Sequence, residues 1–479
     1  MDDRELLRHT ADLAAAFLAG LDARPVGGPV DLAALRDAMG GPLTADGEDA
    51  RAVMDGLARA ADGGIVATAG PRYFGFVVGG SQPAALAADW LTSTWDQNAG
   101  LYALSPAAAV AEEVAAGWLV DLLGLPAGTS CGFTTGATMA NFTALAAARH
   151  AVLRDRHWDV EERGLFGAPE IHVVLGDEAH VTVFVSLQML GLGRGRVHRV
   201  AADEQGRMRP EALRATLTGL DGPTIVVAQA GNVNTGAFDP LPEIGAAVRE
   251  HGGWLHVDGA FGLWAAASPA LRERVVGLDL ADSWTTDAHK WLNVPYDSGL
   301  VFARDAAAHR TAMTLGAAYY IETAGTERDS YNWVAESSRR ARGFTVYAAL
   351  RSVGRNGLAA LLDRCCGHAR RFEELLAGRP GVTILNDVVL NQVLVRFAPP
   401  GGRDEATTEA VDAFTRDVIA RVQVDGTCWL GGTTWHGMAA MRISVSSWAT
   451  SEADVKLSAA AILRCAREAA AALPEASRA

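Results

Sequence analysis

The sequence has few cysteines, no excess of basic residues and no long apolar run, and each shortage excludes a class of protein. Asp and Glu outnumber Lys and Arg by 56 to 42, for a net charge of −14, so a positively charged surface for nucleic acid or anionic membranes is not expected. Five cysteines without a CxxC or Cys/His spacing predict free thiols, with no disulfide framework and no metal site. The acidic start MDDRELLRHT is unlike a secretion signal, and no run of 18 apolar residues follows. We therefore expect a cytoplasmic protein.

Lysine is the scarcest charged residue, because Lys290 and Lys456 are the only lysines among the 42 basic residues. A compositional bias toward Ala, Gly and Arg explains why arginine replaces lysine elsewhere. A lysine that persists against this bias suggests chemistry that guanidinium cannot perform, since lysine can lose its proton and form an imine.

The length of 479 residues and the apolar content of 49% allow two or three domains with a substantial core. Residues 1–62 have apolar positions at helical spacing and predict an N-terminal helical arm. Residues 63–350 form the predicted large domain, and residues 351–479 a smaller α+β domain.

The large domain alternates short apolar runs with helical patterns. Expected strands lie at 171–175, 195–200, 224–230, 254–258, 282–287 and 299–303, and expected helices at 106–124, 139–155, 180–192, 210–219 and 241–251, with a Gly/Thr loop at 132–138. This rhythm predicts an α/β fold with a mostly parallel sheet covered by helices on both faces. Ligands of such sheets bind outside the carboxyl ends of the strands.

Two charged residues are expected at that edge. Lys290, in Asp287-Ala288-His289-Lys290-Trp291, follows the expected strand 282–287, although a lysine on a loop is most often only a surface residue. Asp258, in HVDGA, ends the strand 254–258 and can either cap the next helix or pair with a protonated ring nitrogen. A lysine imine with an Asp facing a pyridinium nitrogen is how proteins tune pyridoxal phosphate (PLP).

Two further segments fit such a cofactor. The loop 134–138 (TTGAT) precedes a long helix, where backbone N–H groups can bind phosphate, and it lacks the GxGxxG pattern of a dinucleotide site. His180, in GDEAH, opens a helix. Its ring is either satisfied by the helix backbone or stacked on the cofactor.

The combination of DAHKW, HVDGA and GDEAH resembles the group II PLP-dependent amino acid decarboxylases, the family of aromatic-L-amino-acid decarboxylase, from about residue 60 to the end. The resemblance implies that Lys290 is the Schiff-base lysine, that Asp258 pairs with the ring nitrogen, and that His180 stacks on the ring. The other implied cofactor contacts are Ala260 beneath the ring, Gly136, Ala137, Thr138 and His289 at the phosphate, and Asn232 near the phenolic oxygen or the substrate.

The same resemblance implies a fold and an assembly. The fold is that of aspartate aminotransferase (fold type I), with a seven-stranded sheet in the large domain. The family forms homodimers in which the N-terminal arm wraps the partner and the active site is completed across the interface. An Ala/Leu-rich arm that cannot bury its apolar face locally fits this assembly.

The substrate region departs from the family pattern. Animal aromatic decarboxylases have an aromatic residue and a proline near the positions of Val77 and Val78, and here two glycines, Gly79 and Gly80, are expected to open space. The candidates for the substrate pocket are Phe76, Val77, Trp95 and Tyr102, each of which also has a plain core interpretation.

The segment expected to supply a proton also departs. Family decarboxylases place a tyrosine there that protonates the substrate carbon after CO2 leaves, and relatives with another residue tend to release an aldehyde with consumption of O2. Counting back from Arg339 puts Ser330 or Trp333 at that place. Tyr331, from the same stretch, is kept as the candidate catalytic residue.

Three functions follow in order of preference. The first is decarboxylation of an L-amino acid to an amine and CO2, with aromatic side chains favoured because the cleft sequence is rich in Tyr, Phe and Trp. The second is O2-dependent decarboxylation to an aldehyde, and the third is an inactive scaffold. Arg442 either meets a substrate carboxylate or forms a structural ion pair, which is the preferred interpretation.

Overall fold

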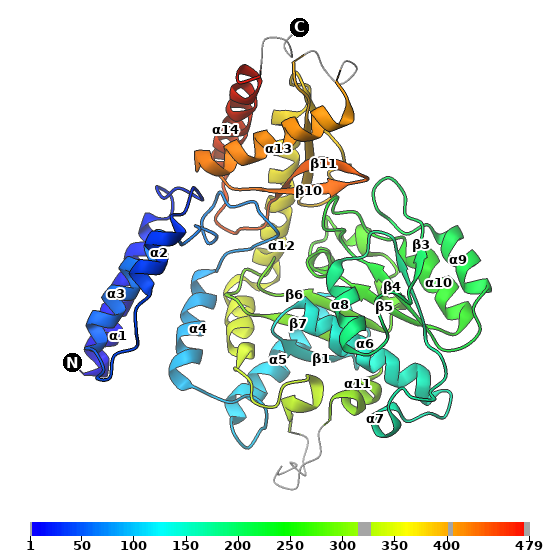
Figure 1. The fold of residues 1–479 in the computed structure, drawn as a ribbon. Helices are drawn as coiled ribbons and strands as arrows, with labels where there is room; N and C mark the ends of the chain where they lie inside the picture. Colours follow the sequence, from blue (N-terminus) through cyan, green and yellow to red (C-terminus); the bar gives the residue numbers. More distant parts are fainter. Residues whose placement is uncertain (1, 315–326, 401–405, 474–479) are drawn as a thin grey trace.

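The structure is a computed structural model that describes residues 2–314, 327–400 and 406–473. Figure 1 shows an N-terminal arm of helices, a central α/β body, and a C-terminal unit with its own sheet. Within the described ranges, no helix combines the length and the apolar character needed to cross a membrane.

A seven-stranded sheet forms the centre of the body. In spatial order its strands are β1 (Ser130–Thr134), β7 (Gly299–Ala303), β6 (Ser283–Asp287), β5 (Trp254–Asp258), β4 (Thr224–Gln229), β2 (His172–Gly176) and β3 (His198–Val200). Strand β7 is antiparallel to both of its neighbours, and the pairs from β6 to β3 are parallel. The predicted mostly parallel sheet of seven strands is therefore confirmed, although β1 lies where the sequence predicted the beginning of a loop.

Helices cover both faces of this sheet, as its apolar strands predict. Val174 and Val226 face one side, and Val173, Ile225 and Val227 face the other. The first side is covered by α5 (Pro106–Leu122), α9 (Pro210–Thr218), α10 (Leu241–His251) and α12 (Arg342–Leu376), and the second by α6 (Ala137–Arg154), α8 (Val181–Met189) and α11 (Ala306–Met313).

The C-terminal unit follows the long helix α12. Its antiparallel sheet has the order β10 (Gly431–Trp435), β11 (Met438–Ser444), β9 (Gln392–Phe397) and β8 (Val382–Ile384), and it is packed with α13 (Thr408–Asp425) and α14 (Glu452–Ala471). Strand β10 had no prediction from the sequence. The backbone of α12 breaks at Gly354, where φ is 59°, close to the domain boundary that we place after residue 350.

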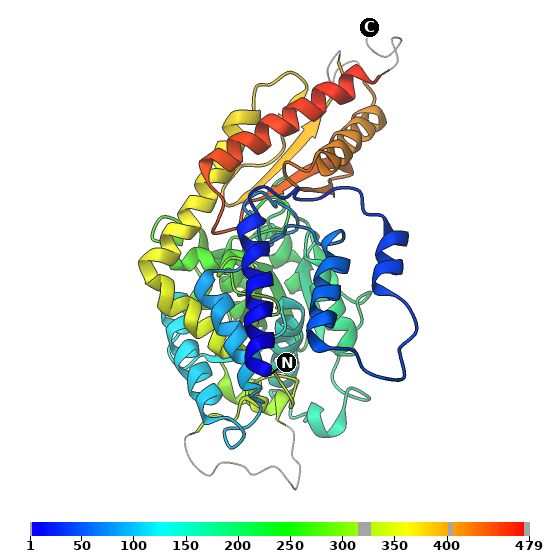
Figure 2. The same cartoon turned by 90° about the vertical axis from the view of Figure 1, so that its left-hand side faces the viewer.

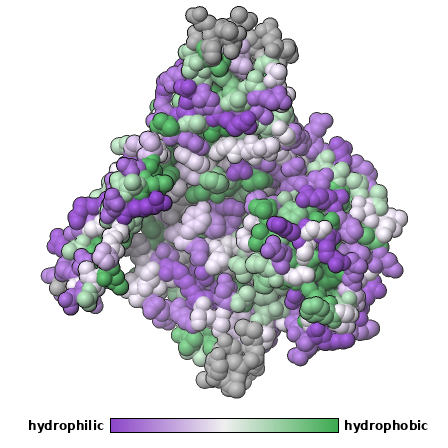
Figure 3. All heavy atoms as spheres, in the orientation of Figure 1, coloured by the Kyte–Doolittle hydropathy of each residue, from purple (hydrophilic) through white to green (hydrophobic). Residues whose placement is uncertain are grey.

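The arm consists of α1 (Asp3–Gly20), α2 (Leu32–Met39) and α3 (Ala50–Asp62), and none of these helices has a buried residue. It stands beside α4 (Pro83–Trp95) in Figures 1 and 2. Leu7, Leu18 and Leu57 are each about half exposed, and hydrophobic side chains reach the surface around the hollow beside the arm (Figure 3). The arm's own chain thus leaves much of its apolar surface uncovered.

A buried ion pair joins α5 to the segment that precedes α12. Glu112 and Arg339 are almost fully buried, and Glu112 Oε1 lies 2.6 Å from Arg339 Nη1. Glu112 Oε2 accepts a hydrogen bond of 2.6 Å from the Ser330 hydroxyl and lies 3.7 Å from Arg328 Nε. Arg339 also donates to the carbonyl of Phe133, at 2.7 Å, in strand β1.

We expect Glu112→Gln to lower the free energy of unfolding by about 3–5 kcal/mol, because it leaves two buried guanidinium groups without a carboxylate. Urea unfolding of the purified protein measures this loss. Asp121→Asn is the control, since Asp121 pairs with Arg355 at an exposed site where the loss should be about 1 kcal/mol or less. Equal small losses in both variants would contradict the structural role of Glu112.

Candidate active site

A cavity of about 320 Å³ lies at the carboxyl ends of β4 and β5. Its lining contains six of the predicted site residues, among them Lys290, Asp258 and His180. The full lining is Phe76, Val77, Val78, His180, Gln229, Gly231, Val233, Asn234, Asp258, Ala260, Phe261, Lys290, Tyr296, Thr433 and Arg442. This is the edge of a parallel sheet at which ligands bind.

Asp258 is the last residue of β5 and is 5% exposed. Its Oδ1 accepts a hydrogen bond of 3.1 Å from the N–H of Ala260, and its Oδ2 accepts one of 3.2 Å from Asn141 Nδ2. Both oxygens are thus held by donors, which fixes the orientation of the carboxylate. A fixed negative charge at this position suits a protonated ring nitrogen.

Lys290 lies three residues beyond the end of β6, and its Nζ is 2.8 Å from Asp287 Oδ2. The backbone of Gly79 packs against it, because a Cβ at residue 79 would lie 1.7 Å from the carbonyl oxygen of Lys290. The expectation that Gly79 opens space for substrate is therefore wrong. Glycine is required at this position for a close approach of two backbones.

The beginning of α6 has the form of a phosphate site. Gly136 is the N-terminal cap of α6, and the N–H of Ala137 donates a hydrogen bond of 2.6 Å to Asp287 Oδ1. A Cβ at residue 136 would lie 3.4 Å from His289 Cε1, so the missing side chain leaves room beside this ring. A helix N-terminus, a neighbouring histidine and Thr138 at the second helical position are the groups that would bind the phosphate of PLP, although the N–H of Ala137 is bonded to Asp287 in this structure.

Asp287, which the sequence analysis did not single out, is the charged centre of this corner. It is 3% exposed, and its Oδ1 is 3.6 Å from His289 Nε2. Burial is the main cause that lowers the pKa of His289, and the nearby Asp287 opposes it. Its position in DAHKW, three residues before the lysine, was the signal available in the sequence.

His180 combines the two interpretations that the sequence left open. Its Nδ1 caps α8 by accepting a hydrogen bond of 3.4 Å from the N–H of Thr182, and it lies 2.8 Å from the Thr182 hydroxyl. Its ring also lines the cavity, as does Ala260. Burial lowers the pKa of His180, with Asp258 opposing and Lys290 adding to the shift, so the ring is neutral at pH 7.

Phe76 and Val77 line the cavity, as predicted for the substrate pocket. Both have positive φ, at 57° and 120°, which is strained for residues with a Cβ and above all for a β-branched one. Such strain concentrates at functional sites. The Phe76 ring stacks on Trp429 at a centroid distance of 5.6 Å.

Trp95, Tyr102 and Tyr331 do not line the cavity of their own chain, and neither do the predicted phosphate contacts Gly136, Ala137, Thr138 and His289. Trp95 is 48% exposed, with its ring edge against Phe344. The N–H of Tyr102 donates to Asp329, and Tyr331 is buried in the 3-10 helix Ser330–Trp333. These aromatic residues were predicted from the sequence around them, which does not show where their side chains lie in the folded protein.

Asn232 is also placed differently from its predicted role. Its Oδ1 accepts hydrogen bonds of 2.8 Å from the N–H of Asn234 and 3.2 Å from the N–H of Thr235. The side chain therefore stabilises its own turn and is absent from the cavity lining, whereas Gly231, Val233 and Asn234 line it.

Arg442, on β11, turns its guanidinium toward the cavity and does not form the structural ion pair that the sequence favoured. Nη1 donates to the carbonyl of Val233 at 3.2 Å, and Nη2 to that of Phe76 at 3.3 Å. Within the described part of the chain, no carboxylate lies within 4.0 Å of it. Burial lowers the pKa of Arg442 to about 10, so it remains a cation at neutral pH.

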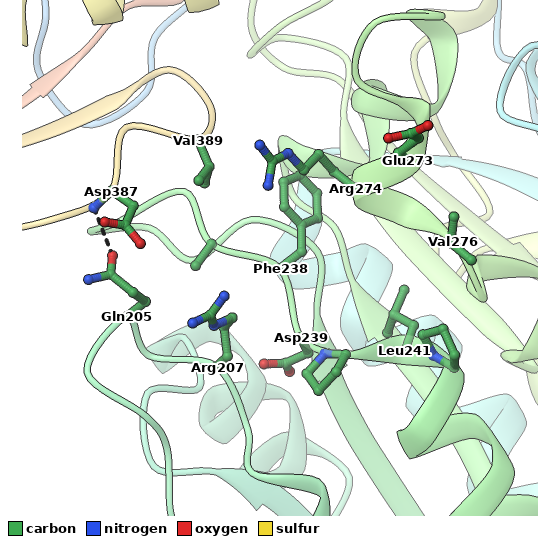
Figure 4. Close-up of a pocket in the computed structure, with 13 residues that line it drawn as sticks. Gln205, Arg207, Phe238, Asp239, Leu241, Glu273, Arg274, Val276, Asp387 and Val389 are labelled. Atoms are coloured by element: carbon green, nitrogen blue, oxygen red, sulfur yellow. Dashed lines mark hydrogen bonds between the residues drawn. The ribbon is translucent and has the colours of Figure 1, made fainter.

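A second cavity of about 250 Å³ lies between the segment after β4 and the C-terminal unit (Figure 4). Asp239 in this cavity accepts hydrogen bonds of 2.7 Å from the N–H groups of Met208 and Gln229, and burial raises its pKa to about 6. Arg207 pairs with Asp203 at 2.7 Å. Both charged groups are held by partners, and the predicted lysine lies in the other cavity.

Sequence comparison places these features in a known family. Residues 36–398 match the pyridoxal-dependent decarboxylase conserved domain. The chain is 26% identical over 457 residues to aromatic-L-amino-acid decarboxylase of Bacillus atrophaeus, covering 94% of this chain and 92% of the relative. It is 32% identical over 370 residues to L-2,4-diaminobutyrate decarboxylase of Rhizobium meliloti (strain 1021), covering 75% of this chain and 71% of the relative.

Solved structures share the fold. The Oryza sativa TDC structure with PLP and tryptamine has a TM-score of 0.90 at 23% identity and covers 97% of both chains. Rhodiola rosea 4-hydroxyphenylacetaldehyde synthase has a TM-score of 0.86 at 23% identity and covers 98% of this chain and 99% of its own. By the family match and the shared fold, this chain belongs to the pyridoxal-dependent decarboxylases and is a PLP-dependent amino acid decarboxylase.

Proposed function

We propose that the protein converts an aromatic L-amino acid to its amine and CO2 in the cavity around Lys290. The observation that carries this proposal is the convergence of Lys290, Asp258 and His180 on one cavity. When bound, PLP supplies a π system that accepts the electrons of the broken bond.

Each of these residues has a separate task in the proposed site. Lys290 would hold the cofactor covalently through its Nζ, and Asp287, 2.8 Å away, accepts a hydrogen bond from this Nζ. Asp258 keeps the ring nitrogen protonated through its negative charge. His180 presents a neutral, flat ring to the cofactor and adds no positive charge that would oppose this protonation.

The preference for an aromatic substrate rests on the apolar part of the lining. Phe76, Val77, Val78 and Phe261 contribute aromatic or branched apolar side chains. An aromatic side chain gains free energy by leaving water for such surroundings. The names of the relatives Tryptophan decarboxylase 1 and aromatic-L-amino-acid decarboxylase support the same class.

In this proposal Arg442 binds the carboxylate of the incoming amino acid. We expect Arg442→Met to raise KM by about 10-fold to 100-fold, because a charge-assisted hydrogen bond contributes about 1.5–3 kcal/mol. Steady-state kinetics measures this change. Arg207→Met, which removes an arginine from the second cavity, serves as the control and should keep the KM of the natural protein. An unchanged KM in Arg442→Met would rule out this role.

Release of an aldehyde with consumption of O2 is the second candidate. Ser330, one of the two positions counted for the family tyrosine, is buried and donates its hydroxyl proton to Glu112. Another observation favours amine formation. Tyr296 places a phenol at the cavity, and burial raises the pKa of this phenol to about 12. It therefore keeps its proton, and it is a candidate donor for amine formation.

Product analysis separates these candidates. The purified holoenzyme is incubated with a mixed pool of L-amino acids with and without O2, and the products are identified by mass spectrometry. The proposal expects an aromatic amine in equal amounts under both conditions. An aldehyde formed only with O2 would establish the second candidate, and the absence of any product would favour the inactive scaffold.

We also propose that the protein is a homodimer whose arm packs on the second subunit. The support is the uncovered apolar surface of α1 to α3 and the apolar groove of about 730 Å³ between α1 and α4. Leu18 lies in this groove, and Leu43 is fully exposed in the arm.

We expect Leu18→Glu to weaken the dimer, because a charge at the interface loses its hydration. Analytical ultracentrifugation should find twice the chain mass for the natural protein and a larger monomer fraction for this variant. Phe166→Glu, the matched control at a 98% exposed apolar residue outside the arm, should remain dimeric. A natural protein that sediments as a monomer at micromolar concentration would contradict the proposal.

The cysteines support the proposed cytoplasmic location. All five are free and buried. Burial raises the pKa of Cys131 to about 12 and that of Cys428 to about 12, so both thiols stay protonated. They neither act as nucleophiles nor require an oxidising compartment.

A further inference from the structure

A chain of buried polar side chains runs through the core and ends on Asp258. Trp254 Nε1 donates to the hydroxyl of Ser283 at 2.9 Å, and this hydroxyl lies 2.9 Å from His256 Nδ1. His256 Nε2 lies 2.9 Å from Asn141 Oδ1, and Asn141 Nδ2 donates to Asp258 Oδ2 at 3.2 Å. This row of hydrogen-bonded side chains, the polar chain, connects strands β5 and β6 with helix α6.

The orientation of the Asn141 amide follows from its partners. Its oxygen accepts a hydrogen bond of 2.8 Å from the Thr285 hydroxyl and faces His256, while its NH2 group faces the Asp258 carboxylate. The opposite orientation would place the amide oxygen against a carboxylate that can only accept. Asn141 is therefore a hydrogen-bond donor to Asp258.

The tautomer of His256 follows in the same way from the hydrogen-bond partners of its two ring nitrogens. Trp254 Nε1 can only donate, so Ser283 Oγ accepts from it and has its own proton available for His256 Nδ1. The other nitrogen, Nε2, then carries the imidazole proton and donates it to Asn141. Burial lowers the pKa of His256 to about 4, which keeps the ring neutral with one donor and one acceptor.

Burying this polar chain costs free energy of folding, which packing alone does not explain. Asn141, His256, Ser283 and Thr285 are all fully buried. Each loses its hydration and needs a partner in the protein, whereas apolar side chains of the same size would fill the space without this requirement. The polar chain connects to Asp258, whose carboxylate lines the cavity.

We infer that Asn141 and His256 are positioning residues for the cofactor: they orient the Asp258 carboxylate and keep it as an acceptor for the protonated ring nitrogen. This inference rests on the proposed function of Asp258. All donors along the polar chain run toward Asp258, which therefore stays an acceptor, and Asp258 itself lines the cavity. Neither residue lines the cavity itself.

The test compares His256→Leu, Asn141→Leu and His256→Gln in the full-length protein. The PLP dissociation constant is measured by equilibrium dialysis, together with the absorption spectrum of the bound cofactor, kcat and KM. We expect the two leucine variants to lose about 10-fold to 100-fold in cofactor affinity and in kcat, with little change in KM. His256→Gln should restore most of both, because its amide can donate to Asn141 in place of Nε2.

Thr143→Val is the matched control. Thr143 is a fully buried residue of the same helix, and its hydroxyl donates to the carbonyl of Met139 instead of the polar chain. It should lower the melting temperature without changing cofactor affinity, the spectrum or kcat. If the leucine variants behave like this control, the polar chain is only structural and the inference is overturned.

The experiment also distinguishes two other outcomes, misfolding of the leucine variants and lack of activity in the natural protein. If neither leucine variant folds, Ser283→Ala decides, since it removes only the hydroxyl that orients His256, and unchanged cofactor affinity and kcat would overturn the inference. If the natural protein binds PLP but makes no product, the proposed function fails. Cofactor affinity and the absorption spectrum then still test the role of Asn141 and His256.

Discussion

Replacement of Lys290 by arginine is expected to lower kcat by about 10⁴-fold or more, because the step that needs a neutral amine is lost outright. Arginine keeps the positive charge and can still pair with Asp287, which lies 2.8 Å from Nζ. It cannot lose its proton or form a covalent bond with the cofactor aldehyde. The decisive measurements are kcat with the substrate found by product analysis and the absorption spectrum of the purified variant.

The chain provides a matched control for this change. Lys456 is the other lysine, lies on α14, and pairs with Glu452 at an exposed site. Lys456→Arg makes the same chemical replacement and should leave kcat and the spectrum unchanged. Turnover by Lys290→Arg within tenfold of the natural protein would remove Lys290 from the catalytic role.

Asp258→Asn should be the second most damaging single change, with a loss of about 10³-fold in kcat and a much smaller change in KM. Asparagine has nearly the same shape, and its oxygen can still accept from Asn141, but the negative charge is gone. Without that charge the ring nitrogen is no longer kept protonated, and it withdraws electrons less strongly. Steady-state kinetics and the cofactor spectrum across pH measure both effects.

A control for the loss of a buried carboxylate is Asp239→Asn in the second cavity. Asp239 is 5% exposed, like Asp258, and accepts two backbone hydrogen bonds. Its replacement should affect stability more than kcat. Near-natural turnover in Asp258→Asn would mean that the ring nitrogen does not depend on this charge.

The large sheet could be predicted because its strands carry the signal themselves. Strands β5 and β7 begin and end at the predicted residues, since an apolar run buried on both faces is bounded by polar or glycine residues. Strands β1 and β10 were missed. Their sequences, SCGFT and GGTTW, contain small and polar residues, and their pairing with β7 and β11 decides their structure.

The core of the site was predictable for a related reason. Lys290, Asp258 and His180 each follow or end a strand, and the carboxyl ends of parallel strands meet at one edge. Asn232 and Tyr331 lie on turns and short helices. There the direction of a side chain depends on local hydrogen bonds that composition and spacing do not specify.

The contacts of the supporting residues had no separate signal in the sequence, although Arg442 itself was a candidate partner of the substrate carboxylate. Asn141 lies within a helix and reaches Asp258 only because α6 packs across β5 and β6. Arg442 lies on β11 in the C-terminal unit, 184 positions after Asp258 in the chain. Such contacts are products of tertiary packing, and a single sequence does not display them.

The cavity around Lys290 is the proposed site of the cofactor. Borohydride reduction of the PLP-loaded protein, followed by proteolysis and mass spectrometry, tests it most directly, because reduction fixes the cofactor to the lysine that binds it. We predict one pyridoxyl group per chain, on the peptide that contains Lys290. Modification of Lys456 or of the N-terminal amine, with Lys290 unmodified, would contradict the claim.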